Sequence, residues 1–443
     1  MRLSERTVAA LPEDVTRPDY DRGAQAIGIV HLGIGAFHRA HMAWYTDRAM
    51  DRGDRDWGIA GVSLRSADVA GQLNPQHGLY TLTERSGAGD HTRLIGSVRG
   101  VLVAAERTDA VIAAIAAPST SIVSLTVTEK GYCRDAAGDL DFGLAGSGSI
   151  YRFLAAGLRR RLDAGLGGLT LLSCDNLADN GGQLARLMGE YLDRHDPALR
   201  SWFEQECAAP STMVDRIVPA TTDHDIAALA ARIRLEDQGT VRTEPFSQWV
   251  IEDRFAGPRP GWERVGAQLV TDVAPFETAK LRMLNGAHSL LAYCGLARGH
   301  TFVHEAVADP ELRALAEALM RQEAAPTIKA AAGQNLASYA DALLVRFDNP
   351  ALEHRLIQIA MDGSQKVPQR WLATLAENQQ NGRLCPAIMA GISAWITHLR
   401  GANGPVQDPV AEALAKAAAL PDPIEALFGP NGLLPSAWQP AGA

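Results

Sequence analysis

At 443 residues the chain is long for one hydrophobic core, and its 47% hydrophobic and 21% charged residues are typical of a globular protein. Its formal charge of -9 argues against a basic nucleic-acid-binding protein, and no apolar run is long enough to span a bilayer. The first residues lack the apolar core of a secretory signal, and the five cysteines show no C-x-x-C spacing. We therefore expect a cytoplasmic protein of two domains with reduced thiols.

The first strong pattern is an apolar strand at residues 27–32, which runs into a G-x-G turn and then a helical pattern. In this arrangement backbone amides and a helix N-terminus hold a pyrophosphate. The first glycine permits the tight turn, and the second lets the phosphates approach the backbone. The third glycine of the usual fingerprint is missing, because His38 occupies its position. The candidate cofactor-binding residues of this turn are Gly33, Gly35, Ala36 and Phe37.

A second apolar run at residues 57–64 has the character of the next strand of a Rossmann-type sheet. The residue that binds the cofactor ribose is expected just beyond its end. Asp68 would hold a ribose diol, whereas Arg65 would hold a 2′-phosphate. NAD is the first choice of cofactor, and NADP stays open.

Two further β-rich runs, 121–128 and 169–174, end at polar residues, among them Glu129 and Asn176. In an open α/β sheet the ligand binds beyond the carboxyl ends of the strands, so both side chains are expected on the rim that carries Gly33. The alternative for Asn176 and its neighbours is ordinary turn and cap chemistry.

From about residue 275 the pattern is helical, so we expect a Rossmann-type α/β domain over 1–270 and a mostly α-helical domain over 271–443. The helix that opens the second domain carries Lys280, Asn285 and His288, which span an arc of about 140° on an α-helix. The alternative is an ordinary helix with a snorkelling lysine and a surface histidine. Helices are also expected at 303–323, 326–346, 351–361, 368–379, 385–399 and 409–419.

Residues 361–370 are expected to form a turn-rich loop that carries Lys366 and Arg370. Such a charged loop is often only a solvated surface. Seven stretches in chain order nevertheless match one family, the polyol-specific long-chain dehydrogenases, which include mannitol 2-dehydrogenase and fructuronate (mannonate) reductase. The matching stretches are VHLGIGAFHRAH (30–41), TVTEKGY (126–132), SCDNLADNGG (173–182), MVDRIVP (213–219), EPFSQWVIEDRF (244–255), KLRMLNGAHS (280–289) and MDGSQKVPQR (361–370).

This resemblance implies an NAD(P)-dependent, metal-independent oxidoreductase that interconverts a secondary alcohol and a ketone at C2 of a linear sugar alcohol or sugar acid. It implies Lys280 as the general base and Asn285 and Asn176 as the amides that hold the substrate oxygen. It further implies that His288 and Lys366 bind substrate and that Glu129 takes part in proton exit. A lysine can act as a base near neutral pH only where burial and nearby cations lower its pKa.

The resemblance leaves the substrate open. Mannitol-type members carry an arginine eight residues before the loop lysine, and Gln358 stands there in this sequence. A sugar acid needs a cation for its carboxylate, which Arg370 or Arg282 would supply. Fructuronate and mannonate are the first choice, with mannitol or another polyol such as arabinitol as the alternative. We expect a monomer or weak oligomer with no nucleic-acid or membrane partner.

Two readings from other classes compete with this one. His31, His38 and His41 could suggest a metal-dependent enzyme, although their spacing fits no common zinc pattern. A non-catalytic nucleotide or sugar sensor would be expected to lack part of the catalytic set, yet Lys280 and Asn285 are both present.

Overall fold

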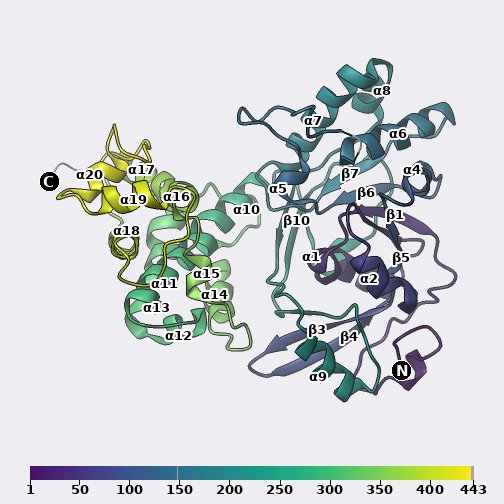
Figure 1. Cartoon of the computed structure of the whole chain (residues 1–443), viewed down its shortest axis with the longest axis horizontal. Coiled ribbons are helices and arrows are strands. Elements are labelled where there is room, and N and C mark those ends of the chain that lie inside the picture. The colour runs from purple at the N-terminus through teal and green to yellow at the C-terminus, as the bar shows by residue number, and fades with distance from the viewer. Residues whose placement is uncertain (147, 441–443) are drawn as a thin grey trace. The chain divides into compact units, whose positions relative to one another are not determined.

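The computed structural model describes residues 1–146 and 148–440, and the chain divides into two compact units, Met1–Val273 and Ala274–Ala443 (Figure 1). We call them the sheet unit and the helical unit. The sheet unit holds all the named strands of the described residues, and helices make up most of the helical unit. The expected combination of an α/β part followed by a mostly helical part is confirmed.

The core of the sheet unit is a five-stranded sheet in the order β5-β2-β1-β6-β7. All four strand pairs are parallel. The first strand lies in the middle and later strands are added on both sides, which is the Rossmann order and confirms that expectation. In this fold the ligand binds where the strand order reverses, here between β1 and β6. The strands are β1 (Ile27–Leu32), β2 (Gly58–Ser63), β5 (Val98–Val103), β6 (Ile122–Leu125) and β7 (Thr170–Ser173).

Helices and further strands cover the two faces of this sheet, because side chains alternate along each strand. Val30 and Leu32 of β1 belong to one apolar cluster with the helices of one face, whereas Ile29 belongs to a second cluster with α2 (Met42–Asp51). Each fully buried side chain of this kind contributes about 1.5–3 kcal/mol to folding. The helices of the first cluster are α4 (Thr108–Ala116), α6 (Ile150–Asp163), α7 (Asn180–His195) and α8 (Pro197–Glu206).

Two three-stranded sheets complete the unit, in the orders β4-β3-β9 and β11-β10-β8. Their strands are β3 (Tyr80–Ser86), β4 (Gly89–Ile95), β8 (Thr212–Asp215), β9 (Val241–Thr243), β10 (Gln248–Glu252) and β11 (Gln268–Val270). The shorter helices of the unit are α1 (Ala36–Ala40), α3 (Asp68–Leu73), α5 (Thr128–Gly131) and α9 (Asp223–Ile233).

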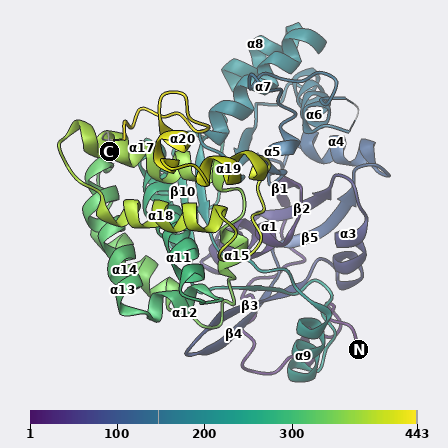
Figure 2. The same cartoon turned by 60° about the vertical axis from the view of Figure 1, so that its left-hand side comes forward.

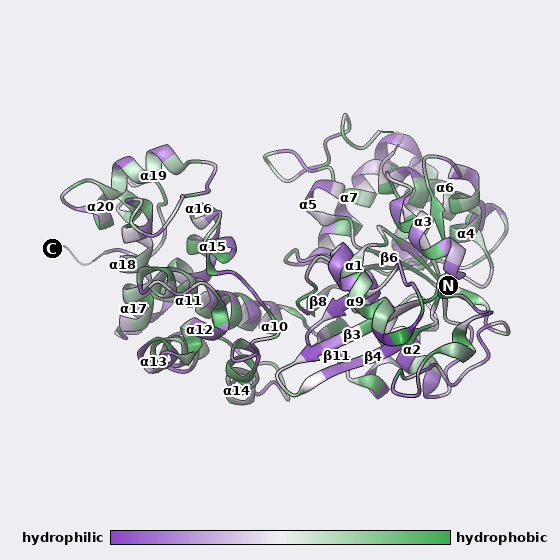
Figure 3. Cartoon of the chain, turned by 60° about the horizontal axis from the view of Figure 1, so that its bottom comes forward, coloured by the Kyte–Doolittle hydropathy of each residue, from purple (hydrophilic) through white to green (hydrophobic). Residues whose placement is uncertain are grey.

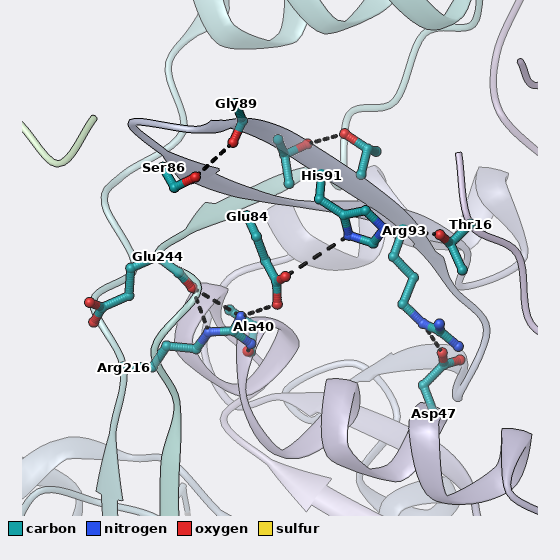
Figure 4. A network of polar contacts seen from close by, with 12 residues as sticks. Thr16, Ala40, Asp47, Glu84, Ser86, Gly89, His91, Arg93, Arg216 and Glu244 are labelled. Atoms are coloured by element: carbon teal, nitrogen blue, oxygen red, sulfur yellow. Dashed lines mark hydrogen bonds and ion pairs between the residues drawn. The ribbon is translucent and has the colours of Figure 1, made fainter. Parts of the chain in front are cut away.

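Arg216, whose side chain is fully buried, connects the β3–β4 hairpin to the helices that follow the glycine turn (Figure 4). Its guanidinium donates to Glu84 Oε1 at 2.6 Å, to Ala40 O at 2.7 Å and to Glu244 O at 3.0 Å. It also lies over the Trp44 ring, 4.5 Å from the ring centroid. These partners compensate a buried charge that would otherwise cost several kcal/mol of solvation.

The helical unit is built around α11 (Gly286–Ala297), which is buried along nearly its whole length and packs against α18 (Pro386–Leu399) (Figure 2). Outer helices such as α19 (Ala411–Ala418) carry both hydrophilic and hydrophobic residues (Figure 3). The other α-helices are α10 (Ala274–Ala279), α12 (Val303–Ala308), α13 (Pro310–Ala318), α14 (Leu336–Phe347), α15 (Leu356–Ile359), α16 (Gly363–Val367), α17 (Ala373–Gln380) and α20 (Pro423–Phe428). Three π-helical turns join some of these: η4 (Lys280–Asn285), η5 (Leu319–Ala324) and η7 (Pro368–Leu372).

Several expectations for this unit are wrong. The helix expected at 351–361 is limited to the four residues of α15. The helix expected at 326–346 begins only at Leu336, because the segment before it contains Pro326 and Gly333, which has a φ of +78°. The loop expected at 361–370 is helical from Gly363 onward. Pro368 has no amide to donate to the preceding turn, and the chain accommodates it in a widened π turn in place of a break.

Candidate functional site

The glycine turn after β1 has the geometry that a dinucleotide requires. Gly33 has a φ of +92°, and a Cβ atom there would lie 2.2 Å from Thr126 O, so no other residue fits. At Gly35, the residue before α1, a Cβ atom would have only Gly33 O within 4 Å, at 3.8 Å. The second glycine therefore leaves open space in front of the backbone, and this space fits the pyrophosphate of a dinucleotide. Ala36 and Phe37 open α1, and the Phe37 ring stacks on that of His41 at 5.0 Å.

Two buried histidines pack beside this turn. The His38 ring, which stands where the third glycine is usual, stacks on the His31 ring with a centroid distance of 3.4 Å. His31 hydrogen-bonds to Ser124 Oγ at 2.8 Å and Thr126 Oγ1 at 2.9 Å, and the latter hydroxyl donates to Gly33 O. Burial lowers the pKa of His31 to about 3, so the ring is neutral. In residues 1–146 and 148–440 no group of three or more His, Cys, Asp or Glu side chains could hold a metal ion, so the metal-site interpretation of these histidines gains no support.

The candidate residues for cofactor choice lie beyond the end of β2. Arg65 and Asp68 are both exposed, and Asp68 is the first residue of α3. Its Oδ2 accepts a hydrogen bond from the Ser66 hydroxyl at 2.9 Å. Both side chains are therefore accessible to a ribose or a phosphate.

Of the polar residues after β6 and β7, one stabilises the local turn and two are exposed to solvent. The buried Asp175 carboxylate accepts hydrogen bonds from Val127 N at 3.1 Å and Thr128 N at 2.8 Å, and burial raises its pKa. It therefore fixes the turn that leads into α5, where Glu129 lies exposed. Asn176, the next residue after Asp175, is also exposed. The turn and cap interpretation thus applies to Asp175, while Asn176 and Glu129 stay accessible for chemistry.

In the helical unit, Lys280 and Asn285 are the first and last residues of the π turn η4, and His288 follows in α11. Lys280 and Asn285 are half-buried, and His288 is buried. The expected α-helical geometry is wrong here, because Gly286 N donates to Leu281 O, five residues back. Burial, with His354 and two arginines nearby, lowers the pKa of His288 well below its usual value. A neutral imidazole can both donate to and accept from sugar hydroxyls.

Basic side chains lie near His288, and the sequence analysis missed two of them, His354 and Arg346. The His354 ring lies edge-on to the His288 ring, with centroids 5.4 Å apart. Lys366 donates to Ile359 O at 3.2 Å and Met361 O at 2.5 Å, and burial and Arg370 lower its pKa. Arg370 donates to Asn285 O at 3.2 Å and Ser289 Oγ at 2.7 Å, and burial lowers its pKa to about 10. A lone His354 between helices carried no signal in the sequence that marked it as more than a surface residue.

Arg282, the other candidate to bind a substrate carboxylate, already forms an ion pair within the helical unit. Its Nη1 atom donates to Glu377 Oε2 at 2.7 Å and to Thr327 O at 2.8 Å. An arginine that already pairs with a carboxylate is a weak candidate for a second one, so Arg370 is the better candidate.

Comparison with known proteins assigns the class. The model of the mannitol dehydrogenase Rossmann domain matches residues 27–264, and that of the mannitol dehydrogenase C-terminal domain matches residues 272–424. The chain belongs to the mannitol dehydrogenase family of oxidoreductases. Across the described residues, no helix combines the length and apolar character needed to cross a membrane.

Individual relatives cover nearly the whole chain. D-mannonate oxidoreductase of Escherichia coli is 40% identical over an alignment of 442 positions, which covers 95% of this chain and 91% of the relative. Mannitol 2-dehydrogenase of Phaeosphaeria nodorum is 38% identical, covering 97% of this chain and 80% of the relative. The structure of Pseudomonas fluorescens mannitol 2-dehydrogenase in ternary complex with NAD and D-mannitol matches with a TM-score of 0.81 and 34% identity, covering 95% of this chain and 89% of that one.

Proposed function

We propose that this protein interconverts a secondary alcohol and a ketone at C2 of a linear sugar acid, D-mannonate and D-fructuronate, with NAD as the hydride carrier. The proposal is carried by one observation: Lys280 and Asn285 lie in the π turn η4, and His288 lies in the helix α11 that follows it. An amine, an amide and a neutral imidazole in this arrangement supply a base, an oxygen ligand and a hydroxyl ligand. A sensor would have no need of a base.

In the oxidation direction the Lys280 amine takes the proton of the C2 hydroxyl. Bound NAD supplies the hydride acceptor. The Asn285 side-chain amide donates to the developing alkoxide without adding a competing charge. For Asn176 the family resemblance supports the same donor role. His288 and Lys366 bind the remaining hydroxyls, and Glu129, which is exposed, passes the proton to solvent. The residues of the glycine turn, Gly33, Gly35, Ala36 and Phe37, hold the pyrophosphate.

The preference for a sugar acid rests on positive charge. Arg346, Lys366 and Arg370 lie near enough to depress the pKa of His288 or His354. A carboxylate would neutralise part of this charge, whereas a neutral polyol would not. The relative named D-mannonate oxidoreductase supports the acid, and relatives of nearly equal identity named mannitol 2-dehydrogenase keep mannitol as the second candidate.

The substrate is tested with fructuronate, tagaturonate, fructose and, for oxidation, arabinitol, following the absorbance of the reduced cofactor. We expect kcat/KM for fructuronate to exceed that for fructose. Arg370→Ala should lower kcat/KM for fructuronate about tenfold more than for fructose, because a charged hydrogen bond is lost only with the acid. Arg282→Ala is the matched control and should change both substrates equally. Equal losses in Arg370→Ala would contradict the carboxylate role.

A second experiment tests cofactor choice. Asp68→Ala should raise KM for NAD about tenfold, because a hydrogen-bonded ribose diol loses its acceptor, and should affect NADP much less. Arg65→Ala should raise KM for NADP more than KM for NAD. Asp109→Ala, which changes an exposed residue of α4, serves as the control and should leave KM for NAD and KM for NADP unchanged. If the variant with both changes uses the two cofactors in the wild-type ratio, these residues do not set the choice.

The cellular setting belongs to the same proposal. All five cysteines are unpaired, two of them only partly buried, which suits the reducing cytoplasm. We further propose that the protein acts as a monomer or weak oligomer on a small-molecule substrate, without nucleic-acid or membrane partners. A sedimentation measurement at micromolar concentration would test the oligomeric state.

A further inference from the structure

Three π-helical turns occur in the helical unit, although this conformation accounts for well under 1% of residues in globular proteins. Each is closed by the defining five-residue hydrogen bond. The bonds run from Gly286 N to Leu281 O in η4, from Ala325 N to Met320 O in η5 and from Ala373 N to Pro368 O in η7. Both η5 and η7 pack against η4. Single π turns are frequent at functional sites, and here two of them pack against a third, the one that carries Lys280 and Asn285.

The π turn changes which side chains of η4 share a face. On an α-helix Lys280 and Asn285, five residues apart, would point about 140° away from each other. A π turn has about 4.4 residues per turn, so the two side chains point only about 50° apart. His288, three residues further on, then also falls close to that face. The widened turn therefore gathers the amine, the amide and the imidazole that an α-helix would spread apart.

Two side chains of η7 hold the end of this turn. The Trp371 indole, which is fully buried, donates from Nε1 to Gly286 O at 3.1 Å. The neighbouring Arg370 donates to Asn285 O at 3.2 Å. Both bonds end on backbone carbonyls at the junction of η4 and α11, where a helix changes from the π to the α repeat.

Both neighbouring π turns lie close to Gly286. A Cβ atom at this position would lie 3.3 Å from Leu319 Cδ2 of η5, 3.6 Å from Arg370 O and 3.7 Å from Trp371 Nε1. Only the first distance is tight, and it ends on the flexible tip of a leucine, whereas the other two are ordinary van der Waals contacts. The backbone at the start of α11 is therefore packed directly against η7.

We propose that Trp371 is a positioning residue: its indole N–H, bound to Gly286 O, fixes the π turn that aligns Lys280 with Asn285. This inference rests on the proposed function, because it concerns the alignment of the proposed base with the proposed oxygen ligand. The effect of the indole on the π turn concerns the backbone alone and can be measured without turnover.

The test compares Trp371→Phe, which keeps a buried ring and removes the N–H, with the full-length wild type. We expect kcat for alcohol oxidation to fall about tenfold, the scale of one lost hydrogen bond, with KM for NAD unchanged. The apparent pKa in the pH profile of kcat/KM should move, because the amine is no longer held beside the amide. Hydrogen exchange of the backbone amides of residues 281–289 should become faster in the absence of substrate and cofactor.

Trp262→Phe is the matched control, because that indole is also fully buried and donates to a side chain, Thr46 Oγ1 at 3.1 Å, in the sheet unit. It should leave kcat and the exchange of residues 281–289 as in the wild type. Replacing Trp371 by 3-benzothienylalanine is a second route to the same state, since sulfur takes the place of the N–H and the fused ring keeps its size. It should reproduce the lower kcat and the faster exchange even if Trp371→Phe fails to fold.

The possible results distinguish failure of the role of Trp371 from failure of the proposed function. Wild-type exchange and kcat in both variants would overturn the inference, and so would faster exchange with an unchanged kcat. Equal losses of kcat in Trp262→Phe and Trp371→Phe would also overturn it, by showing a general loss of stability. If the wild-type protein oxidised none of the sugar substrates, the proposed function would fail, while faster exchange in Trp371→Phe would still support the role of the indole in the turn.

Discussion

Replacing Lys280 by alanine is expected to lower the rate of alcohol oxidation about 10³-fold while NAD still binds. General-base catalysis contributes about 10² to 10⁴ to a rate, and the amine is the only base that the proposed chemistry uses at C2. The side chain is half-buried at the start of η4 and belongs to the helical unit, so its loss leaves the glycine turn of the sheet unit untouched. The measurements are kcat for oxidation and the Kd for NADH from fluorescence.

The design of this experiment allows the base to be identified directly. Lys416→Ala removes an exposed lysine that pairs with Glu412 on α19, and it should retain the wild-type rate. The rise of kcat/KM with pH that reports deprotonation of the base should disappear in Lys280→Ala. A small amine added to the buffer should restore part of the lost rate. A Lys280→Ala protein with wild-type turnover would remove Lys280 from this role and would favour a non-catalytic sensor or another base.

Replacing Asn285 by alanine is expected to lower kcat about 10²- to 10³-fold, the usual effect of losing one donor to a developing oxyanion. KM for the sugar should change little, since the hydrogen bond strengthens only as charge develops on the oxygen. The backbone of η4 should survive the change, because Arg370 binds the carbonyl oxygen of Asn285 and not its side chain.

Asn285→Asp provides a stricter test, because it replaces the amide donor with a carboxylate of the same size that carries a negative charge. The aspartate would repel the alkoxide, so its rate should fall below that of Asn285→Ala. Asn431→Ala, at an exposed position of the same unit, is the control and should match the wild type. A larger effect on KM than on kcat in Asn285→Ala would show that the amide only binds substrate.

Much of this protein can be read from local patterns in the sequence. The strand at 27–32, the glycine pair after it and the helical pattern that follows predict the Rossmann start, because in this arrangement backbone amides receive a pyrophosphate. The observed β1 has the same bounds, and the positive φ at Gly33 agrees with the tight turn. The distinction between an α/β part and a helical part follows from hydrophobic periodicity, which is a local property.

Other features depend on contacts between segments far apart in the chain. Pro368 alone indicates a break, yet the chain around it is helical, because packing of the helical unit stabilises a widened turn there. The ion pair between Arg282 and Glu377, 95 residues away, could not be predicted from local patterns either. The same holds for His354, which gains its meaning only beside His288.

Residues 280–288 show the division most clearly. Their sequence determined a helix that carries a lysine, an asparagine and a histidine, because apolar spacing specifies one buried stripe. Only the tertiary structure decided that its first part is a π turn. An isolated chain prefers the α repeat, and the hydrogen bonds from Trp371 and Arg370 to the end of η4 come from residues 85 positions further along. The physical reason is that the sequence sets local preferences, whereas the orientation of Lys280 toward Asn285 depends on donors that only folding brings near.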